Sequence, residues 1–313
     1  MILCCGDTLI DMLPRRTANG EPAFAPYVGG ALFNSAIALG RVGAPAGLLT
    51  GLSSDFFGSM LSAALAESRV DASYAHISDN HTTLAFVRLM DGQASYTFFD
   101  DNSAGRMLLE SDLPALDPGI KAMLFGCMTL IAEPCGSTYE ALMRHEYRNR
   151  VMMLDPNIRP DFIPDKPAHL ARLRRMVAMA DIVKLSDEDL AWFGEAGSPD
   201  EAASGWLKQG PKLIVVTHGA RGAHAYSRHG KTSVAARKVD IVDTVGAGDT
   251  FNAGILASLD NSGFLSKDAV AGLSEQSIRQ ALEFAAKIAA VTVSRAGANP
   301  PWRRELDGEP SPA

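Results

Sequence analysis

Short apolar runs alternate with longer stretches of helical periodicity along most of the chain. Runs of three to five mainly apolar residues stand at 2–5, 122–125, 151–154, 182–184 and 213–217. A short apolar run bounded by polar or turn residues is typical of a strand that is buried on both faces. Because strands that alternate with helices form parallel sheets covered on both sides, the pattern predicts an α/β domain with a mostly parallel central sheet.

The stretches between and after these runs carry apolar residues at helical spacing. We expect helices over 31–43, 60–68, 137–148, 167–179, 187–194, 201–209, 251–259 and 274–293. Two further short strands are expected, at Leu48–Leu52 and at Lys238–Val242.

Two stretches depart from the α/β alternation. Residues 82–89 and 94–99 are rich in β-branched and aromatic side chains, and Asp91-Gly92 between them is a strong hairpin signal. Residues 12–28 contain prolines and Asn-Gly, which predict short strands and turns. We interpret these stretches as a small β layer; an edge hairpin of the main sheet is the alternative.

Composition and charge narrow the class of protein. With 313 residues, 47% of them hydrophobic, the chain is long and apolar enough to form a large hydrophobic core in one or two domains. A net charge of -7 argues against a nucleic-acid-binding protein. The N-terminus lacks the basic region of a signal peptide and no apolar run has transmembrane length, so we expect a cytoplasmic protein without a membrane segment. The four cysteines, at positions 4, 5, 127 and 135, are expected to be reduced and buried.

The segment Asp243–Gly254 carries the clearest candidate chemistry. It contains three small residues, Gly246, Ala247 and Gly248, where an expected strand meets an expected helix. Backbone amides at a helix N-terminus attract an anion, and small residues let the anion approach closely. Asp249 in the same turn could accept the proton of an attacking hydroxyl, so the segment suits phosphoryl transfer. The alternative is a glycine-rich turn with an Asp at a helix start.

This string resembles the signature of the ribokinase-like (PfkB) carbohydrate kinases. Further motifs resemble the same family at 29–34 (Gly-Gly-Ala-x-x-Asn), 51–58, 155–159, 217–222 and 297–303, so the resemblance spans nearly the whole chain. It implies one ribokinase-like α/β domain over 1–313, with a mostly parallel sheet and helices on both faces. It also implies a small β lid, from about 12–28 and 82–100, that closes over the sugar and often mediates a homodimer.

The resemblance assigns the site residues in four groups. The base is Asp249, with an anion hole formed by Gly246, Ala247 and Gly248. The residues expected to hold the sugar are Asp11, Gly29, Gly30, Asn34 and Arg159. The residues expected near ATP and Mg²⁺ are Ser186, Asp189, Thr217, Gly219 and Gly222. The residues expected near a monovalent cation such as K⁺ are Asp243, Val245 and Gly297.

One motif departs from the family. Where the family has Asn-x-x-Glu near the ATP phosphates, this chain has Ser186 and Asp189. These two residues are equally the pattern of a well-capped acidic helix start, with Ser186 as the N-cap.

The function that the resemblance implies is phosphorylation of a sugar hydroxyl by MgATP, foremost that of a fructokinase. A 2-keto-3-deoxygluconate kinase or a ribokinase is the alternative within the family. A catalytically silent sugar- or nucleotide-sensing protein is the alternative outside it, suggested by the altered Ser186/Asp189 motif.

Overall fold

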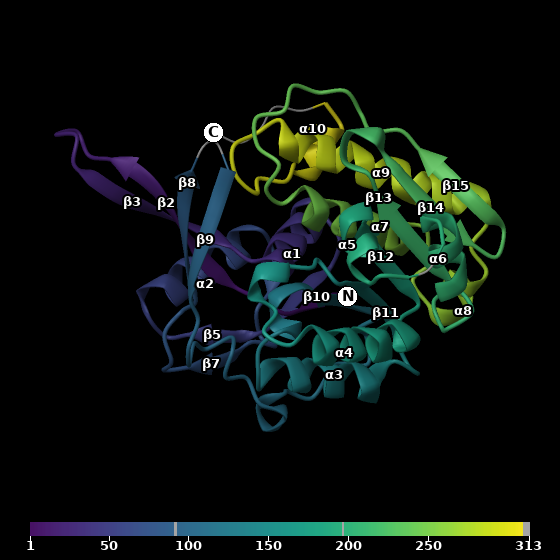
Figure 1. Cartoon of the computed structure of the whole chain (residues 1–313), viewed down its shortest axis with the longest axis horizontal. Coiled ribbons are helices and arrows are strands. Elements are labelled where there is room, and N and C mark those ends of the chain that lie inside the picture. Colours follow the sequence, from purple (N-terminus) through teal and green to yellow (C-terminus); the bar gives the residue numbers. More distant parts are fainter. Residues whose placement is uncertain (91–92, 196, 309–313) are drawn as a thin grey trace.

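The computed structural model describes residues 1–90, 93–195 and 197–308, and within them a nine-stranded sheet forms the centre of the body (Figure 1). Its order is β15-β14-β13-β12-β11-β10-β1-β4-β6. The strands are β1 (Ile2–Cys5), β4 (Ala46–Leu49), β6 (Val70–Asp71), β10 (Ala122–Gly126), β11 (Val151–Asp155), β12 (Ile182–Ser186), β13 (Leu213–Thr217), β14 (Ala223–Ser227) and β15 (Gly230–Val234). From β6 to β13 every neighbouring pair is parallel, and only the pairs β13–β14 and β14–β15 are antiparallel. The predicted parallel sheet and the five apolar runs are therefore confirmed.

Helices cover both faces of this sheet. The helices α1 (Ala31–Arg41), α7 (Ala247–Asn261) and α9 (Glu275–Val293) lie on one face, and α3 (Cys135–Glu146), α4 (Lys166–Met179), α5 (Asp187–Trp192) and α6 (Pro199–Trp206) on the other. Figure 1 shows α7 and α9 opposite α3 and α4 across the sheet. Cys4 belongs to the first core and Cys5 to the second, as expected for neighbours on a buried strand. All four cysteines are free and buried, as predicted.

The remaining helices are short or peripheral. They are α2 (Phe56–Glu67), α8 (Lys267–Ala271), α10 (Arg303–Leu306) and the 3₁₀ turns η1 (Glu110–Asp112), η2 (Cys127–Leu130), η3 (Pro160–Phe162) and η4 (Gly219–Arg221). In the part of the chain that the structure describes, no helix is both long and apolar enough to cross a membrane.

The alanine-rich helix α9 packs directly on α7. A Cβ atom added to Gly254 of α7 would lie 2.4 Å from Cα of Ala285, so the two backbones touch at a glycine. This close contact holds the first turn of α7, with the Asp243–Gly254 segment, against the rest of the body.

A second, smaller sheet stands out from the body and is called here the outer sheet (Figure 1). Its strands, in the order β3-β2-β8-β9, are β3 (Pro22–Gly29), β2 (Leu9–Arg16), β8 (Leu84–Met90) and β9 (Gln93–Phe99). The segments expected to form a β layer thus form a sheet separate from the main one. The predicted turn at Asp91-Gly92 lies outside the described residues. A two-stranded pair, β5 (Gly51–Ser53) with β7 (His76–Ser78), lies at its base.

Some predictions of individual elements were wrong. Lys238–Val242 is not a strand: the backbone is irregular, and Ile241 and Val242 are 62% and 63% exposed. The N–H of Val242 donates to the carbonyl of Val293 at the end of α9, so this segment is hydrogen-bonded to the end of a helix and not to a strand. The expected strand Leu48–Leu52 is divided between β4 and β5, which belong to different sheets. The hairpin of β14 and β15 was not predicted.

Candidate active site

The carboxylate of Asp249 lies buried at the start of α7. Gly246 precedes the helix in a left-handed conformation, with φ of 76°, which glycine adopts without strain. Asn34 of α1 donates from Nδ2 to Oδ2 of Asp249 over 2.9 Å, and Ser35 donates from Oγ to the Asp249 carbonyl over 3.1 Å. The Gly-Gly-Ala-x-x-Asn motif and the Asp243–Gly254 segment, far apart in the sequence, therefore meet at one carboxylate.

Burial changes the acidity of this carboxylate. The pKa of Asp249 is raised to about 7, mainly by burial and in smaller part by the nearby carboxylates of Asp155 and Asp7, while the hydrogen bond from Asn34 and the charge of Lys184 lower it. A group that titrates near neutrality is matched to accept a proton at physiological pH.

The first turn of α7 presents backbone donors beside Asp249. An α-helix leaves its first N–H groups without intrahelical acceptors, and its dipole makes that end positive. The N–H of Ala247 donates to the Thr244 carbonyl at 3.3 Å. Gly248 and Asp249 therefore contribute the amides that an anion would meet first.

The expected sugar-side residues surround the link between the body and the outer sheet. A Cβ atom at Gly29 would lie 2.5 Å from Oδ2 of Asp11, so a side chain there would displace the Asp11 carboxylate. Burial raises the pKa of Asp11 to about 6, and the charge of Asp7 contributes. At Gly30, φ is 113° and a Cβ atom would lie 2.6 Å from the Asp7 carbonyl, so this position requires glycine.

Asp7 is a site residue whose role the sequence analysis missed. Its two carboxylate oxygens accept the N–H groups of Ala31 and Leu32 at 3.0 and 3.1 Å, which fixes the start of α1. The available signal was an Asp directly after Gly6, where the first strand ends.

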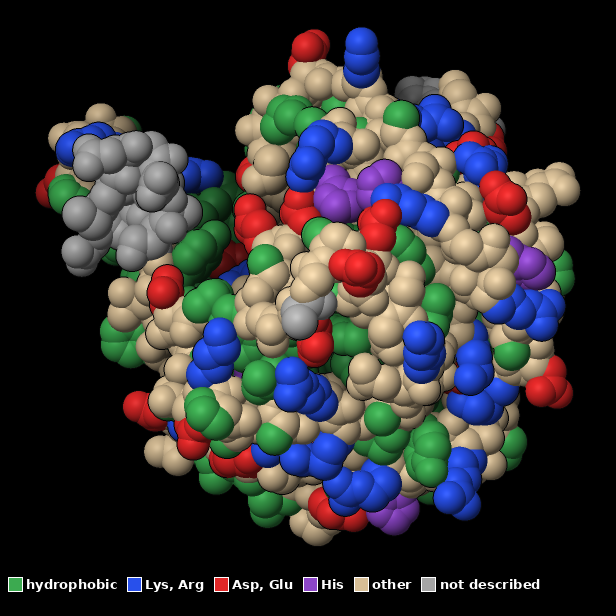
Figure 2. All heavy atoms as spheres, turned by 45° about the vertical axis from the view of Figure 1, so that its right-hand side comes forward, with side chains coloured by type: hydrophobic (Ala, Val, Ile, Leu, Met, Phe, Trp, Pro, Cys, Tyr) green, Lys and Arg blue, Asp and Glu red, His purple; other side chains and the backbone are tan. Residues whose placement is uncertain are grey.

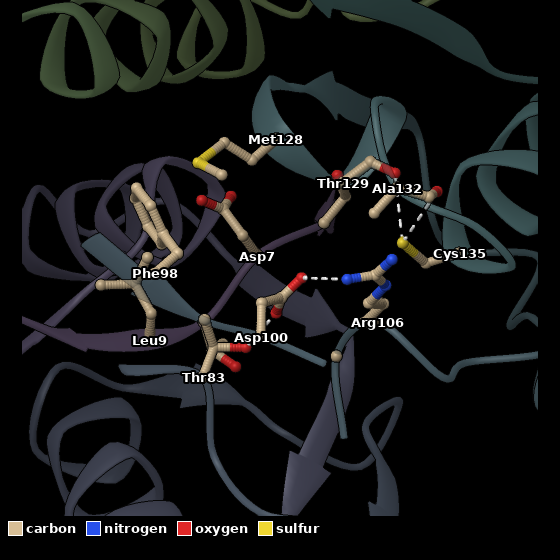
Figure 3. A pocket seen from close by; sticks show the side chains of 12 residues that line it. Asp7, Leu9, Thr83, Phe98, Asp100, Arg106, Met128, Thr129, Ala132 and Cys135 are labelled. Carbon is tan, nitrogen blue, oxygen red and sulfur yellow. Dashed lines mark hydrogen bonds and ion pairs between the residues drawn. The ribbon is translucent and has the colours of Figure 1, made fainter. Parts of the chain in front are cut away.

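A small cavity of about 30 Å³ lies between the outer sheet and the body (Figure 3). Phe98 of β9, Asp7 and Met128 line one part of it, and Asp100 lines another. Asp100 accepts hydrogen bonds from the hydroxyls of Thr83 and Ser103 at 2.6 and 2.8 Å. Phe98, Asp100 and Met128 were not identified from the sequence, because nothing in their spacing links them to the motifs.

Arg159 brings a positive charge to the same edge of the sheet. It follows β11 and donates from Nη1 to Oδ1 of Asn157 over 2.6 Å. Burial disfavours the charged guanidinium, but the acidic groups nearby, with Asp249 among them, raise its pKa overall. Arg159 therefore stays charged within the field of the proposed base.

Ser186 and Asp189 form a capping box at the start of α5. The hydroxyl of Ser186 accepts the Asp189 N–H at 3.0 Å, and the Asp189 carboxylate accepts the Ser186 N–H at 3.1 Å. The other oxygen of that carboxylate accepts the N–H of Ile158 at 2.9 Å. The capped-helix interpretation is thus correct for the contacts, and Asp189 also holds the loop that carries Arg159. A role of these two residues toward ATP and Mg²⁺ remains a prediction.

A larger cavity of about 450 Å³ lies on the other side of the α7 N-terminus. Thr217, Gly219 and Gly222 line it, as do Ala247 and Gly248. Small residues of α9 and the segment 236–241 complete its wall, with Ala286, Ala289, Ala290, Val239 and Ile241 among them. Ile241 is exposed because it borders this cavity, and this explains the apolar character that suggested a strand. The cavity joins the expected ATP residues to the turn next to Asp249.

The expected cation residues also meet. Asp243 accepts the N–H of Val245 at 3.0 Å with one carboxylate oxygen and the N–H of Gly297 at 2.9 Å with the other. Each oxygen of this carboxylate thus accepts one backbone amide, and Asp243 joins the two loops.

Comparisons with known proteins agree with this geometry. The family model of the pfkB family carbohydrate kinases matches residues 1–304. The chain is 54% identical over 279 residues to a fructokinase of Rhizobium leguminosarum bv. trifolii, covering 89% of this chain and 86% of that protein. It is 38% identical over 266 residues to a fructokinase of Salmonella typhimurium, covering 82% and 84%.

Solved structures are similar over nearly the whole chain. A fructokinase of Xylella fastidiosa with bound ATP matches with a TM-score of 0.87 at 28% identity, covering 95% of this chain and 93% of that one. A fructokinase of Vibrio cholerae O395 in a form with fructose, ADP and calcium bound matches with a TM-score of 0.82 at 27% identity, covering 95% and 94%.

Proposed function

The chain belongs to the pfkB family of carbohydrate kinases, and on that basis we propose that it is an ATP-dependent fructokinase. The observation that carries the choice of sugar is the 54% identity to a fructokinase over 89% of the chain. The site supports the reaction class independently, because it joins a buried carboxylate of neutral pKa to a helix N-terminus and a large adjacent cavity.

The site residues have different roles in phosphoryl transfer. Asp11, Asn34 and the backbone at Gly29 and Gly30 hold the sugar, and Asp249 accepts the proton of the attacking hydroxyl. The amides of the α7 turn and the Arg159 guanidinium stabilise negative charge on the transferring phosphoryl group. Asn34 orients the carboxylate of Asp249 through its 2.9 Å hydrogen bond.

ATP fits the cavity beside the α7 turn. Its volume of about 450 Å³ and its wall of small apolar residues suit a flat aromatic base, and Thr217, Gly219 and Gly222 border it. Gly248, on the same wall, would face the phosphates.

Mg²⁺ and K⁺ are the cations that we propose. Among the described residues, no three His, Cys, Asp or Glu side chains are grouped to hold a metal. Mg²⁺ would therefore be held mainly by ATP phosphates and water, with Ser186 and Asp189 as the protein contacts. The bound Mg²⁺ would neutralise phosphate charge during transfer. K⁺ would be held by backbone carbonyls around Val245 and Gly297, which Asp243 brings together. A related fructokinase of Vibrio cholerae O395, a double mutant 26% identical to this chain, has a structure with potassium bound.

We infer that the outer sheet is a lid. Figure 2 shows a hollow between the projecting sheet and the body. Phe98 of β9 packs edge-on against Phe162, which belongs to η3, with ring centroids 4.8 Å apart. Phe162 lies three residues after Arg159 in the chain. Closure of the outer sheet would therefore cover both Arg159 and the sugar site and would exclude water from them.

We also propose a homodimer through the far face of the outer sheet. Phe24 and Phe99 are 48% and 56% exposed on this face, Phe86 packs edge-on against both of them, and a hollow of about 770 Å³ lies beside them. An exposed aromatic group of this kind is typical of a protein–protein contact. A second copy of the same face would cover it with a symmetric interface.

A coupled assay of ADP release over fructose, ribose, 2-keto-3-deoxygluconate and nucleosides tests the proposed function. We expect fructose to give the highest kcat/KM. A preference for the keto-deoxy acid or for ribose would support the corresponding kinase instead. If no sugar stimulates ADP release, the silent sensor is correct and the kinase proposal fails.

A further inference from the structure

A lysine lies within a buried strand directly behind the α7 turn. Lys184 is the third residue of β12, its neighbours Val183 and Leu185 are fully buried, and its own side chain is 6% exposed. Its ammonium donates to Oδ2 of Asp155 at 2.9 Å, and the Asp155 side chain is 5% exposed. Lysine is almost never buried unless it is paired, so this pair requires an explanation.

The position of the ammonium relative to α7 is well defined. β11 and β12 pair in parallel with Leu154 beside Val183, so Asp155, the last residue of β11, and Lys184 lie side by side on the same face. A Cβ atom added to Gly248 would lie 3.0 Å from Nζ of Lys184, and no other heavy atom outside the local helix backbone comes within 4 Å of it in the described part of the chain. The positive end of the pair therefore touches the turn that offers amides to an anion, and the carboxylate lies farther away.

Stability alone does not account for this pair. Asn252, one turn along α7 from Asp249, also donates to Oδ2 of Asp155, at 2.7 Å. The other carboxylate oxygen of Asp155 and the amide oxygen of Asn252 are buried without a hydrogen-bond partner among the described residues. Buried ion pairs are weak sources of stability, and unpaired buried acceptors cost free energy. Unsatisfied buried groups in a native structure require an explanation, and a catalytic role is one.

We propose that Lys184 and Asp155 form a buried dipole that strengthens the anion-binding turn of α7 during phosphoryl transfer. This inference rests on the proposed kinase function. The ammonium adds a fixed positive charge behind the Gly248 amide, in surroundings of low dielectric, where it acts along with the helix dipole. Lys184 does not touch the phosphoryl group; it is a positioning residue that acts through the turn. Gly248 is accordingly needed for contact with Lys184 as well as for close approach of a ligand.

The double variant Lys184→Met/Asp155→Asn tests this proposal. It removes both charges while keeping similar shapes, so no unpaired charge is left in the core. Removal of a donor that touches an oxyanion lowers kcat by ~10²–10³. Removal of the Lys184 charge, which lies behind the donating turn and does not touch the phosphoryl group, should lower kcat by less, ~10–10². We expect kcat with fructose to fall by that factor, while the melting temperature and the Kd for ATP without sugar change little. A kcat within twofold of the wild type would overturn the proposal.

A second lysine–aspartate pair, in which the lysine is partly exposed, supplies the control. Lys267 and Asp181 pair at 2.8 Å, with side chains 33% and 7% exposed, and Lys267 follows the far end of α7. Lys267→Met/Asp181→Asn should lower the melting temperature and leave kcat unchanged. If both pairs lower kcat equally, the effect of the first is structural and the proposal is wrong.

The affinity for a transition-state analogue separates this inference from the proposed function. MgADP with aluminium fluoride mimics the transferring phosphoryl group, and its binding requires no turnover. We expect the Lys184→Met/Asp155→Asn variant to bind it more weakly by the same ~10–10² factor. Unchanged affinity would overturn the inference even in an active kinase. Absence of turnover in the wild type together with weakened binding of the analogue would overturn only the proposed function.

Discussion

Asp249 is the residue in which burial and chemistry are most directly connected. It lies 8% exposed at the start of a helix, and burial is the main reason that its pKa is raised to about 7. Among the described residues, its carboxylate accepts one side-chain hydrogen bond, from Asn34, a neutral donor that orients the carboxylate without neutralising it. The carboxylate is therefore still basic enough to accept a proton near neutral pH.

The pH dependence of kcat follows from this pKa. Only ionised Asp249 accepts the hydroxyl proton, so activity requires loss of its own proton. We expect kcat at saturating fructose and ATP to rise with pH, to be half-maximal near pH 7, and to level off above it. Steady-state assays between pH 5.5 and 8.5 check this. A kcat that is constant from pH 6 to 8 would mean that another group accepts the proton.

At the residue scale, motifs predicted which residues lie near one another better than they predicted supporting groups. The proximity of Asn34 to Asp249, of Asp243 to Gly297 and of Thr217 to Gly248 agrees with the motif strings, whereas the hydrogen bonds within the first two pairs were not predicted. Lys184 was not singled out, since a lone Lys in a short apolar run gives no sign of the partner that it meets on the next strand. Pairings of this kind depend on sheet register, which the sequence does not state.

At the element scale, the contact between α7 and α9 sets the position of the catalytic turn. Gly254→Ala places a methyl group 2.4 Å from Cα of Ala285, so the helices must separate. Overpacking of this kind costs ~1–3 kcal/mol of stability. We expect chemical denaturation to show that loss.

Gly205→Ala is the matched control for this substitution. Gly205 lies in α6, and no heavy atom outside its own helix comes within 4 Å of an added Cβ atom among the described residues. There alanine should be neutral or stabilising by up to ~1 kcal/mol. Equal effects of the two substitutions would contradict the packing argument.

The outer sheet provides a second prediction at this scale. If it closes on sugar, the amides of β8 and β9 should exchange more slowly with solvent when fructose is bound. Hydrogen exchange over 84–90 and 93–99, with and without saturating fructose, measures this. Exchange that does not change on saturation would leave the outer sheet as a fixed β layer and remove its role as a lid.

An element could be predicted from the sequence where burial in the sheet was the only cause of its pattern of apolar residues. Strands buried between two helix layers are mostly apolar, so β1, β10, β11, β12 and β13 were evident in the sequence. The segment Lys238–Val242 mixes polar and apolar residues, and its apolar residues have a different role, since Val239 and Ile241 border the cavity proposed for ATP. β15 is an edge strand with Gly230, Lys231 and Ser233 exposed, and β14 beside it carries the partly buried His224 and Ser227, so the pattern of the hairpin was weak.

At the scale of the whole molecule, the outer sheet determines the oligomeric state that we propose. Phe24→Ser and Phe99→Ser together should convert the dimer to a monomer, since they remove the most exposed aromatic side chains of that sheet. Sedimentation velocity at several concentrations measures the change. Leu109→Ser is the control, because Leu109 is 46% exposed on the body. A wild-type protein that is monomeric at all concentrations would contradict the proposed interface.

The central claim is that the protein is a sugar kinase with Asp249 as its base, and the most direct test is kcat of Asp249→Asn with fructose and MgATP. Asparagine keeps the shape of the side chain and accepts the same hydrogen bond from Asn34, but it cannot accept the proton. General-base assistance is worth ~10²–10⁴, so we expect kcat to fall by that factor while the melting temperature and the Kd for ATP stay close to wild type. Asn also caps helices about as well as Asp, so a purely structural role predicts little loss. An Asp249→Asn enzyme with kcat near the wild-type value would contradict the account.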